Sequence, residues 1–133
     1  MIALDSSAIV AVLLLEPEAA DFRRAIAASG ALVGAPTLVE TRLVLESSLS
    51  GRAENALRAF LHGTGIAIVP FDAAMVEAAA EAFVRFGKGR HPAKLNFGDC
   101  LSYAVARVHA LPLLFKGGDF VHTDIVPAHA PAP

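Results

Sequence analysis

The sequence contains a single cysteine, Cys100, and no run of apolar residues long enough to cross a lipid bilayer. One cysteine excludes a disulfide within the chain and a zinc site built from several thiolates. The longest apolar runs, such as Ala8–Leu15, are far shorter than the roughly 18 residues of a membrane-spanning helix. The N-terminal segment MIALD lacks the basic residues that open a signal peptide. We therefore expect a cytoplasmic protein with no membrane contact.

Charged residues are also scarce, at 18% of the 133 residues, and neither sign dominates. The formal net charge is -2, so the chain lacks the basic surface that proteins binding duplex DNA usually show. A nucleic acid would have to be bound by a local basic patch or through metal ions. Apolar residues make up 55% of the chain. This content is enough for the core of one domain and leaves apolar side chains for a partner or a second copy.

Two kinds of apolar segment alternate along the chain. Short apolar runs predict strands at residues 1–4, 31–34, 66–71, 112–116 and, at the edge, 125–126. Capping residues and apolar stripes predict helices at residues 8–15, 17–28, 37–49, 54–62, 73–86 and 97–108. Strands that alternate with helices predict a parallel sheet with helices on both faces. We expect one α/β domain over residues 1–126 and a disordered tail over residues 127–133, which are rich in Pro and Ala.

Four acidic residues follow these strands or open these helices: Asp5, Glu40, Asp99 and Asp119. Asp5 and Asp119 come directly after predicted strands, and Glu40 lies in the first two turns of the helix after the second strand. Asp99 can reach the same place if the loop before its helix folds over the sheet. Because the ligand site of an open α/β sheet lies beyond the carboxyl ends of its strands, the four acids form a candidate site.

Three of these acids also have a purely structural explanation. Asp5 could cap the helix that follows it, because aspartate is a favoured N-cap residue. Asp99 lies three residues after Asn96, which is the spacing of a capping box. Asp119 could be a turn residue after two glycines. The acids therefore need a further reason to be interpreted as a functional site.

Glu40 supplies part of that reason. Its helix face continues through Leu43 and Val44, which we expect to point inward, and a carboxylate there is costly unless something neutralises it. Carboxylates that converge without paired cations repel one another, and a divalent cation would remove this repulsion. Mg²⁺ and Mn²⁺ prefer oxygen ligands and assist phosphodiester hydrolysis. The acids thus predict metal-assisted phosphoryl transfer, most simply the hydrolysis of a nucleic acid.

Four segments resemble the successive motifs of PIN-domain ribonucleases, and more closely those of the VapC toxins of bacterial toxin–antitoxin pairs. They are LDSSAI at the N-terminus, VET in the third helix, LNFGDCLSYAVAR and PLLFKGGDFVHTDI. The resemblance extends from Met1 to about Ile125. It implies a three-layer α/β/α PIN-like fold and an endoribonuclease that depends on Mg²⁺ or Mn²⁺. It also implies an RNA substrate, a cognate antitoxin that keeps the enzyme inactive, and a homodimer.

The resemblance also assigns roles to individual residues. The catalytic and metal-binding acids that it implies are, in chain order, Asp5, Glu40, Asp99 and Asp119. Ser7 matches a small hydroxyl residue near the first acid. Toxins with this C-terminal motif often carry two adjacent acids before the Phe, whereas this chain has Gly118 in the first of these places. Asp124 is a candidate to replace the missing acid.

Two other functions stay open at this point. One is a catalytically inactive PIN-like binding module, and the other is a phospho-acceptor signalling domain, which also gathers acids and a lysine at parallel strand ends. The second lacks an acidic pair after the first strand, and Asp72 opens a helix without the expected loop. A dehalogenase-type phosphatase would need an aspartate at the position of Ser7.

The segment before the helix of Asp99 carries four basic side chains: Arg85, Lys88, Arg90 and Lys94. They could grip RNA phosphates, or they could belong to a solvated loop. Lys116 could contact a phosphate or form an ion pair with the acids. Cys100 belongs to an apolar helix stripe, so we expect it in the core.

Several helices carry more apolar side chains than one small core needs. The helices at residues 8–15 and 36–49 are candidates for a groove that accepts an amphipathic antitoxin helix. Those at residues 76–86 and 97–108 are candidates for a dimer contact. Each of these faces is also explained as plain core.

Overall fold

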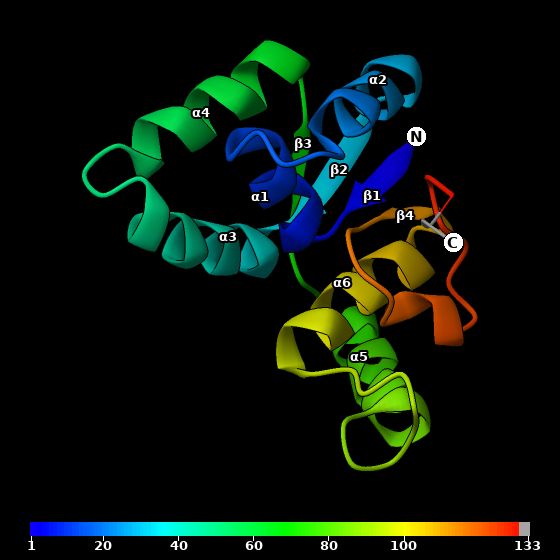
Figure 1. The fold of residues 1–133 in the computed structure, drawn as a ribbon. Coiled ribbons are helices and arrows are strands. Elements are labelled where there is room, and N and C mark those ends of the chain that lie inside the picture. Colours follow the sequence, from blue (N-terminus) through cyan, green and yellow to red (C-terminus); the bar gives the residue numbers. More distant parts are fainter. Residues whose placement is uncertain (131–133) are drawn as a thin grey trace.

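Four short strands lie side by side at the centre of the molecule and run in the same direction (Figure 1). The structure is a computed structural model, which describes residues 1–130. The strand order is β3-β2-β1-β4. The elements are β1 (Ile2–Leu4), α1 (Ser6–Leu13), α2 (Ala19–Ser29), β2 (Ala31–Gly34), α3 (Ala35–Ser48), α4 (Ala53–Thr64), β3 (Ala67–Val69), α5 (Ala73–Phe86), α6 (Phe97–Val108), β4 (Leu113–Leu114) and the 3-10 turn η1 (Phe120–His122).

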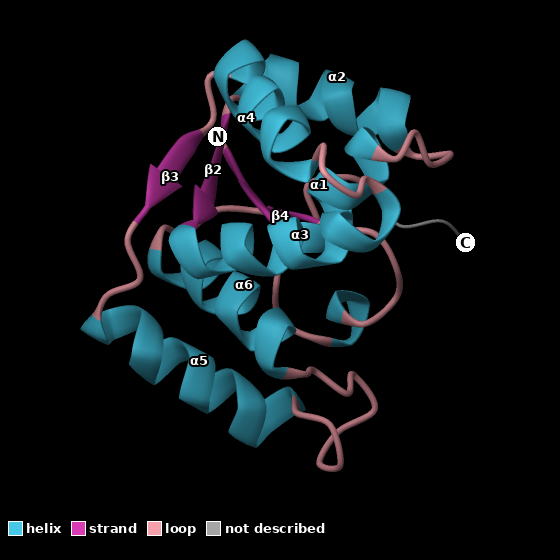
Figure 2. Ribbon diagram, turned by 90° about the vertical axis from the view of Figure 1, so that its left-hand side faces the viewer, coloured by secondary structure: helices cyan, strands magenta, loops and turns pink. Residues whose placement is uncertain are grey.

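Helices lie on both sides of the sheet (Figure 2). Alternate residues of the strands belong to apolar clusters with opposite helix layers. In β1, Ile2 and Leu4 belong to an apolar cluster with side chains of α1, α2, α3 and α4. Ala3, between them, belongs to a second cluster with side chains of α5 and α6. Successive side chains of a strand point to opposite faces of the sheet, so this division produces three layers. The α/β/α architecture with a central parallel sheet is confirmed.

Some element boundaries differ from the predictions. The helix α1 begins at Ser6 because Asp5, directly after β1, caps it. The strand predicted at residues 112–116 is reduced to β4, and residues 125–126 form no strand. Instead, the N–H of Leu113 donates to the carbonyl of Val126 at 2.9 Å, and the N–H of Ala128 donates to the carbonyl of Leu113 at 2.8 Å.

These two hydrogen bonds also fix the start of the segment at residues 127–133, which we expected to be a disordered tail. Pro127 pairs with Leu113 at the sheet edge, and the ring of His129 contacts that of Phe22 in α2, with the centroids 5.5 Å apart. Residues 127–129 are therefore packed against the domain, whereas Ala130 is exposed. Residues 131–133 of the predicted tail lie outside the described residues.

The helix α3 buries a face that differs from the expected one. Its buried residues are Thr37, Thr41 and Leu45. The buried hydroxyl of Thr41 donates to the carbonyl of Thr37 at 2.7 Å, so this polar group can be buried without losing its hydrogen bond. Leu43 and Val44 are instead 67% and 44% exposed. The expectation that these two apolar residues face the core is wrong, and they form an exposed strip instead.

The orientation of α3 predicts very different effects for two leucines on the same helix. Leu45→Ala should lower the free energy of unfolding by about 2–5 kcal/mol, because it leaves a cavity in the core. Leu43→Ala should change it by less than about 0.5 kcal/mol, because this side chain is largely exposed. Unfolding in urea measures both values. Equal losses in the two variants would contradict the buried face described here.

Candidate active site

The four acids predicted to form a site lie at the carboxyl edge of the sheet. Asp5 follows β1, Asp119 lies in the segment after β4, and Glu40 is in the second turn of α3, which follows β2. Asp99 is in the first turn of α6. Burial raises the pKa of Asp99, and the negative charges of Asp5, Asp119 and Glu40 each raise it further. We call these four carboxylates at the edge of the sheet the acid cluster.

Asp5 is the most buried member of the acid cluster, at 4% exposed. Its Oδ2 accepts hydrogen bonds from the N–H and the hydroxyl of Ser7 at 3.1 and 2.5 Å. Its Oδ1 accepts a hydrogen bond from the hydroxyl of Ser102 in α6 at 2.5 Å. The hydroxyl of Ser7 in turn accepts one from the N–H of Lys116 at 3.0 Å. Asp5 is therefore the N-cap of α1 and also a link to α6 and to the segment after β4.

Glu40 is half-buried, and its carboxylate lies against the first turn of α6. A Cβ atom added at Gly98 would lie 2.7 Å from the carboxyl carbon of Glu40, which is closer than real contacts allow. Burial raises the pKa of Glu40, a hydrogen bond with Ser6 lowers it, and the charge of Asp5 raises it further. The Oε1 atom of Glu40 is buried without a hydrogen-bond partner among the described residues. Such an atom calls for a positively charged or donating ligand.

Asp99 is both a capping residue of α6 and a member of the acid cluster. Its Oδ2 accepts a hydrogen bond from the N–H of Asn96 at 3.0 Å, and its own N–H donates to Oδ1 of Asn96 at 2.9 Å. This capping box is the one expected from the sequence. Burial raises the pKa of Asp99 to about 6; the hydrogen bond to Asn96 opposes this rise and the three other acids add to it. The cap therefore holds the carboxylate inside the cluster.

Asp119 is the exposed member of the acid cluster, and it precedes η1. Its neighbour Phe120 is 3% exposed and packs against Phe115, with 5.1 Å between the ring centroids. The hydroxyl of Thr123 donates to the carbonyl of Phe120 at 2.7 Å and closes the turn. The packing of these neighbours fixes the backbone of Asp119, while its side chain faces solvent.

Three residues around the acids were not identified from the sequence: Ser6, Gly98 and Ser102. Ser102 is buried and bonded to Asp5, and its signal in the sequence is a hydroxyl within an otherwise apolar stretch of α6. Buried hydroxyls need a partner, which points to a polar group nearby. Gly98 has a weaker signal, since a glycine inside a helix costs stability and can mark the close approach of another group.

Lys116 forms ion pairs outside the acid cluster. Its Nζ lies 3.2 Å from Oε2 of Glu16 and 3.6 Å from Oε1 of Glu18, both in the connection between α1 and α2. Hydrogen bonding to Glu16 raises the pKa of Lys116. Of the two roles that the sequence left open for this lysine, the structure shows the ion pair, although with acids other than those expected.

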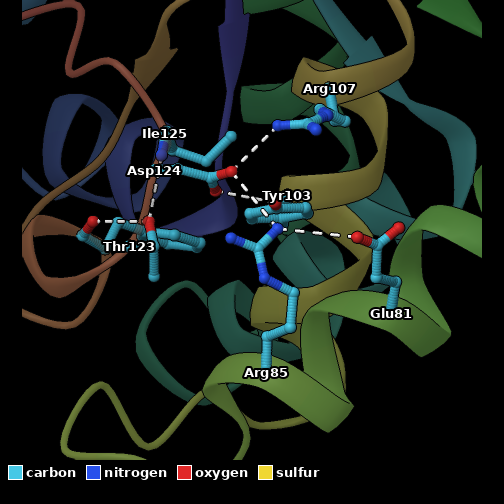
Figure 3. A network of polar contacts seen from close by, with 8 residues as sticks. Glu81, Arg85, Tyr103, Arg107, Thr123, Asp124 and Ile125 are labelled. Atoms are coloured by element: carbon cyan, nitrogen blue, oxygen red, sulfur yellow. Dashed lines mark hydrogen bonds and ion pairs between the residues drawn. The ribbon is translucent and has the colours of Figure 1, made fainter.

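Asp124 does not take the place of the acid that is missing at Gly118. Its Oδ1 accepts a hydrogen bond from the hydroxyl of Tyr103 at 2.7 Å, and its Oδ2 lies 2.9 Å from Arg107 and 3.4 Å from Arg85 (Figure 3). Burial alone would raise the pKa of Asp124, but the bond to Tyr103 and the two guanidinium groups lower it below its usual value. Both oxygens are thus engaged with α5 and α6.

The donor atoms of the acid cluster fit a hard divalent cation. They are carboxylate and hydroxyl oxygens, which Mg²⁺ and Mn²⁺ prefer, and the Oε1 of Glu40 lacks a partner among the described residues. Within residues 1–130, however, no three His, Cys, Asp or Glu side chains are close enough to enclose an ion as they stand. Like charges repel, so a cation would have to draw the carboxylates toward one another.

Comparison with known proteins identifies the family. The model of the PIN domain matches residues 2–126. This chain belongs to the PIN-domain family. It is 41% identical over 129 residues to Ribonuclease VapC30 of Mycobacterium tuberculosis, which covers 96% of this chain and 98% of the relative. It is 42% identical over 127 residues to Ribonuclease VapC of Mycolicibacterium smegmatis, with 95% and 98% covered.

Solved structures agree with membership of the PIN-domain family. VapC20 of Mycobacterium tuberculosis, described as a sarcin–ricin loop cleaving toxin, matches with a TM-score of 0.74 at 25% identity and covers 95% of this chain and 97% of its own. A toxin–antitoxin complex from Klebsiella pneumoniae matches the fold with a TM-score of 0.69 at 15% identity, with 97% and 98% covered. None of these similarities points to a phospho-acceptor domain.

The raised pKa of Asp99 should make the stability of this PIN domain depend on pH in buffer without divalent cations. Between about pH 4 and about pH 6, the folded chain keeps a proton on Asp99 that the unfolded chain releases. The free energy of unfolding therefore falls as the pH rises through this interval. We expect the Tm to increase when the pH is lowered from about 7.5 to about 5.5.

Two variants test this origin of the pH dependence. Asp99→Asn keeps the capping box, so it should raise the Tm near neutral pH and weaken the dependence on pH. Asp72→Asn changes the N-cap of α5 in the same way and should keep the wild-type dependence. Thermal melts with circular dichroism measure both, and an unchanged pH dependence in Asp99→Asn would contradict the assignment.

Proposed function

We propose that the acid cluster binds Mg²⁺ or Mn²⁺ and that this VapC-type endoribonuclease uses the cation to hydrolyse RNA. The ribonuclease activity and the role as a toxin follow from homology to VapC ribonucleases along nearly the whole chain. The metal, which the family resemblance implies, is the proposed part of this function, and one observation supports it most directly. Burial, with three neighbouring acids adding to it, raises the pKa of Asp99 to about 6, and no lysine or arginine of the described chain forms an ion pair with any of the four acids, so the cluster lacks positive charge.

The residues of the cluster would share the binding of the cation. Asp5 and Asp99 are the principal ligands in this proposal, because hydrogen bonds from Ser7, Ser102 and Asn96 already orient their carboxylates. Glu40 would contribute its unpartnered Oε1. Asp119, which faces solvent, would complete the set on the side open to RNA. Bound there, the cation would supply activation of water and charge stabilisation for the hydrolysis of a phosphodiester.

A cognate antitoxin is the partner that a toxin ribonuclease requires, and an exposed apolar surface beside the acids supports it. A cavity of about 630 Å³ adjoins Glu40 and is lined by side chains of α3 and of the start of α6. Val39 and Leu43 of α3, which line it, are 61% and 67% exposed. Exposed apolar surface of this kind marks sites of protein contact. We assign this surface to the antitoxin.

The homodimer is supported by a second group of exposed apolar side chains. Val76, Phe83 and Val84 of α5 are exposed, and Phe83 lines a smaller cavity. Phe97 of α6 lines both this cavity and the one assigned to the antitoxin, so the two surfaces adjoin at this residue. These are the two helices that we expected at a dimer contact. We propose that a second copy of the chain covers them.

The cellular location stays a prediction. No helix within residues 1–130 combines the length and the apolar character needed to span a bilayer. Cys100 is buried, as expected, and burial raises the pKa of its thiol to about 11. A single unreactive cysteine suits the reducing cytoplasm that we propose.

The metal proposal is tested by exchanging acids for amides. Asp5→Asn and Asp99→Asn should each reduce cleavage of RNA by about 100-fold or more and weaken the binding of Mn²⁺, because a charged ligand becomes neutral at nearly constant size. Asp72→Asn, which replaces another N-cap aspartate, should leave both unchanged. Titration calorimetry follows Mn²⁺, and gel assays follow cleavage. Wild-type cleavage in excess chelator, or wild-type activity in both variants, would refute the site.

A glycine offers an independent test of the place of Glu40. Gly98→Ala introduces a Cβ atom that overlaps the carboxylate of Glu40, whose flexible end can move without unfolding α6. We expect cleavage to fall about tenfold or more, while the Tm stays equal or rises because alanine favours the helix. Gly63→Ala in α4 is the matched control, since its Cβ atom meets nothing within 4 Å. Full activity in Gly98→Ala would show that cleavage does not require the carboxylate of Glu40 at its position beside the first turn of α6.

A further inference from the structure

Three cations in the loop between α5 and α6 carry charge that the described chain does not compensate: Lys88, Arg90 and Lys94. Each is exposed, and none forms an ion pair within residues 1–130. They make up three of the 11 Lys and Arg residues and lie within seven consecutive positions of a chain with a net charge of -2. A local excess of positive charge favours the binding of a polyanion.

The basic side chains on the neighbouring elements are already neutralised. Arg85 of α5 lies 3.5 Å from Glu81 and 3.4 Å from Asp124, and Arg107 of α6 lies 2.9 Å from Asp124 (Figure 3). Lys116, after β4, is held by two glutamates. The guanidinium of Arg90 lies over the ring of Phe83, 5.5 Å from its centroid, a contact that does not neutralise its charge. Of the basic residues near α6 in the described chain, those of the loop are therefore the ones without an acidic partner.

The loop is a defined structure that can present these charges in fixed places. Its two ends pair, since the N–H of Lys88 donates to the carbonyl of Leu95 at 2.9 Å and the N–H of Leu95 donates to that of Phe86 at 3.0 Å. Ala93 and Leu95 are fully buried. The Nδ1 atom of His91 accepts a hydrogen bond from the N–H of Ala93 at 3.0 Å. A ligand would therefore not have to order the loop when it binds.

Lys94 adopts a backbone conformation that is unfavourable for its residue type. Its φ is +53°, in the left-handed region that favours glycine. Gly89 in the same loop, with a φ of +84°, is the residue normally found in such a turn. Leu15 and Ala110 adopt the same conformation, with φ values of +55° and +54°, so the backbone geometry does not by itself require a charged side chain at Lys94. It does hold Lys94 in a fixed backbone position at the end of the loop.

We propose that Lys88, Arg90 and Lys94 bind the phosphates of the RNA substrate and hold the strand beside the acid cluster, an inference that rests on the proposed ribonuclease function. Lys94 precedes the cap residue Asn96 by two positions, and Asp99 follows in the first turn of α6. A short, hydrogen-bonded segment thus connects the phosphate contacts to the acids. Contacts of this type depend on charge and position the strand without reading its sequence.

An RNA partner fits this loop better than an acidic protein does. The exposed residues between positions 88 and 94 are Lys, Gly, Arg and Pro, and the apolar Ala93 is buried. The centre of a protein–protein interface is usually apolar and depleted of charge. The loop lacks such a centre among its exposed residues, whereas uncompensated cations are what a phosphate backbone requires.

The first experiment measures the affinity for RNA in the presence of a chelator, so that the strand stays intact. The double variant Lys88→Gln/Arg90→Gln should bind a fluorescent single-stranded RNA about tenfold more weakly than the wild type at moderate salt. The slope of log K against log salt should shrink by about 1.4, which is about 0.7 for each lost phosphate contact. In cleavage assays, KM should rise while kcat stays nearly unchanged.

The matched control for this variant is Arg23→Gln/Arg52→Gln. It also removes two exposed cations that form no ion pair within the described chain. The control should keep the wild-type affinity and salt slope. Equal losses in the two double variants would show a general effect of net charge and overturn the assignment to the loop.

A single substitution separates binding from strain at Lys94. Lys94→Gly removes the charge and accommodates the positive φ, so RNA should bind more weakly while the Tm stays equal or rises. A higher Tm with unchanged affinity for RNA would overturn the role of Lys94.

The failure of this inference can be told apart from that of the ribonuclease function. If the wild type binds Mn²⁺ and cleaves RNA but the loop variant keeps wild-type affinity and salt slope, only the loop proposal falls. If the wild type does not cleave RNA with Mn²⁺, the proposed function falls and the loop proposal with it. A loop variant that binds RNA normally but no longer binds the co-expressed antitoxin would identify a protein-binding surface and overturn the proposal.

Discussion

The buried carboxylate of Asp5 holds together the elements that form the functional edge of the sheet. A charge that is 4% exposed must have its acceptor oxygens satisfied, and the hydroxyls of Ser7 and Ser102 satisfy them. Ser7 also accepts a hydrogen bond from the N–H of Lys116. One charged group thus connects β1, α1, α6 and the segment after β4, which come from opposite ends of the chain.

This arrangement concentrates negative charge, and the pKa values of the neighbouring acids show its effect. Burial raises the pKa of Glu40 and of Asp99, so the fold keeps carboxylates where stability alone would not place them. Such conflicts with local rules are typical of functional sites. The cations around α6 follow two patterns. Arg85 of α5 and Arg107 of α6 form ion pairs with Asp124. The basic side chains of the loop between α5 and α6 form no ion pair within the described residues. A net charge of -2 therefore conceals an uneven distribution, with an acid cluster at the edge of the sheet and a basic loop between α5 and α6.

Most of the fold could be predicted from the sequence, because the features that specify it are local. Apolar runs and caps such as Asp72 and Asn96 mark where strands end and helices begin. The alternation of strands and helices then requires a parallel sheet, and topology alone brings Asp5, Glu40 and Asp119 to one edge. The capping box of Asp99 was also predictable, because its two residues are three positions apart.

Other features depend on contacts between distant parts of the chain, and only the tertiary structure decided them. Ser102 and Asp5 are separated by 97 positions, so nothing local to either residue identifies the other as its partner. Asp124 was equally compatible with the acid cluster, until its contacts with Tyr103 and two arginines placed it elsewhere. Leu43 is as apolar as a core residue, yet α3 packs on another face. The sequence by itself determined the order and kind of the elements, whereas packing decided the partner of each side chain. The reason is that the apolar periodicity of a segment shows which of its faces is apolar, but not which other segment that face contacts.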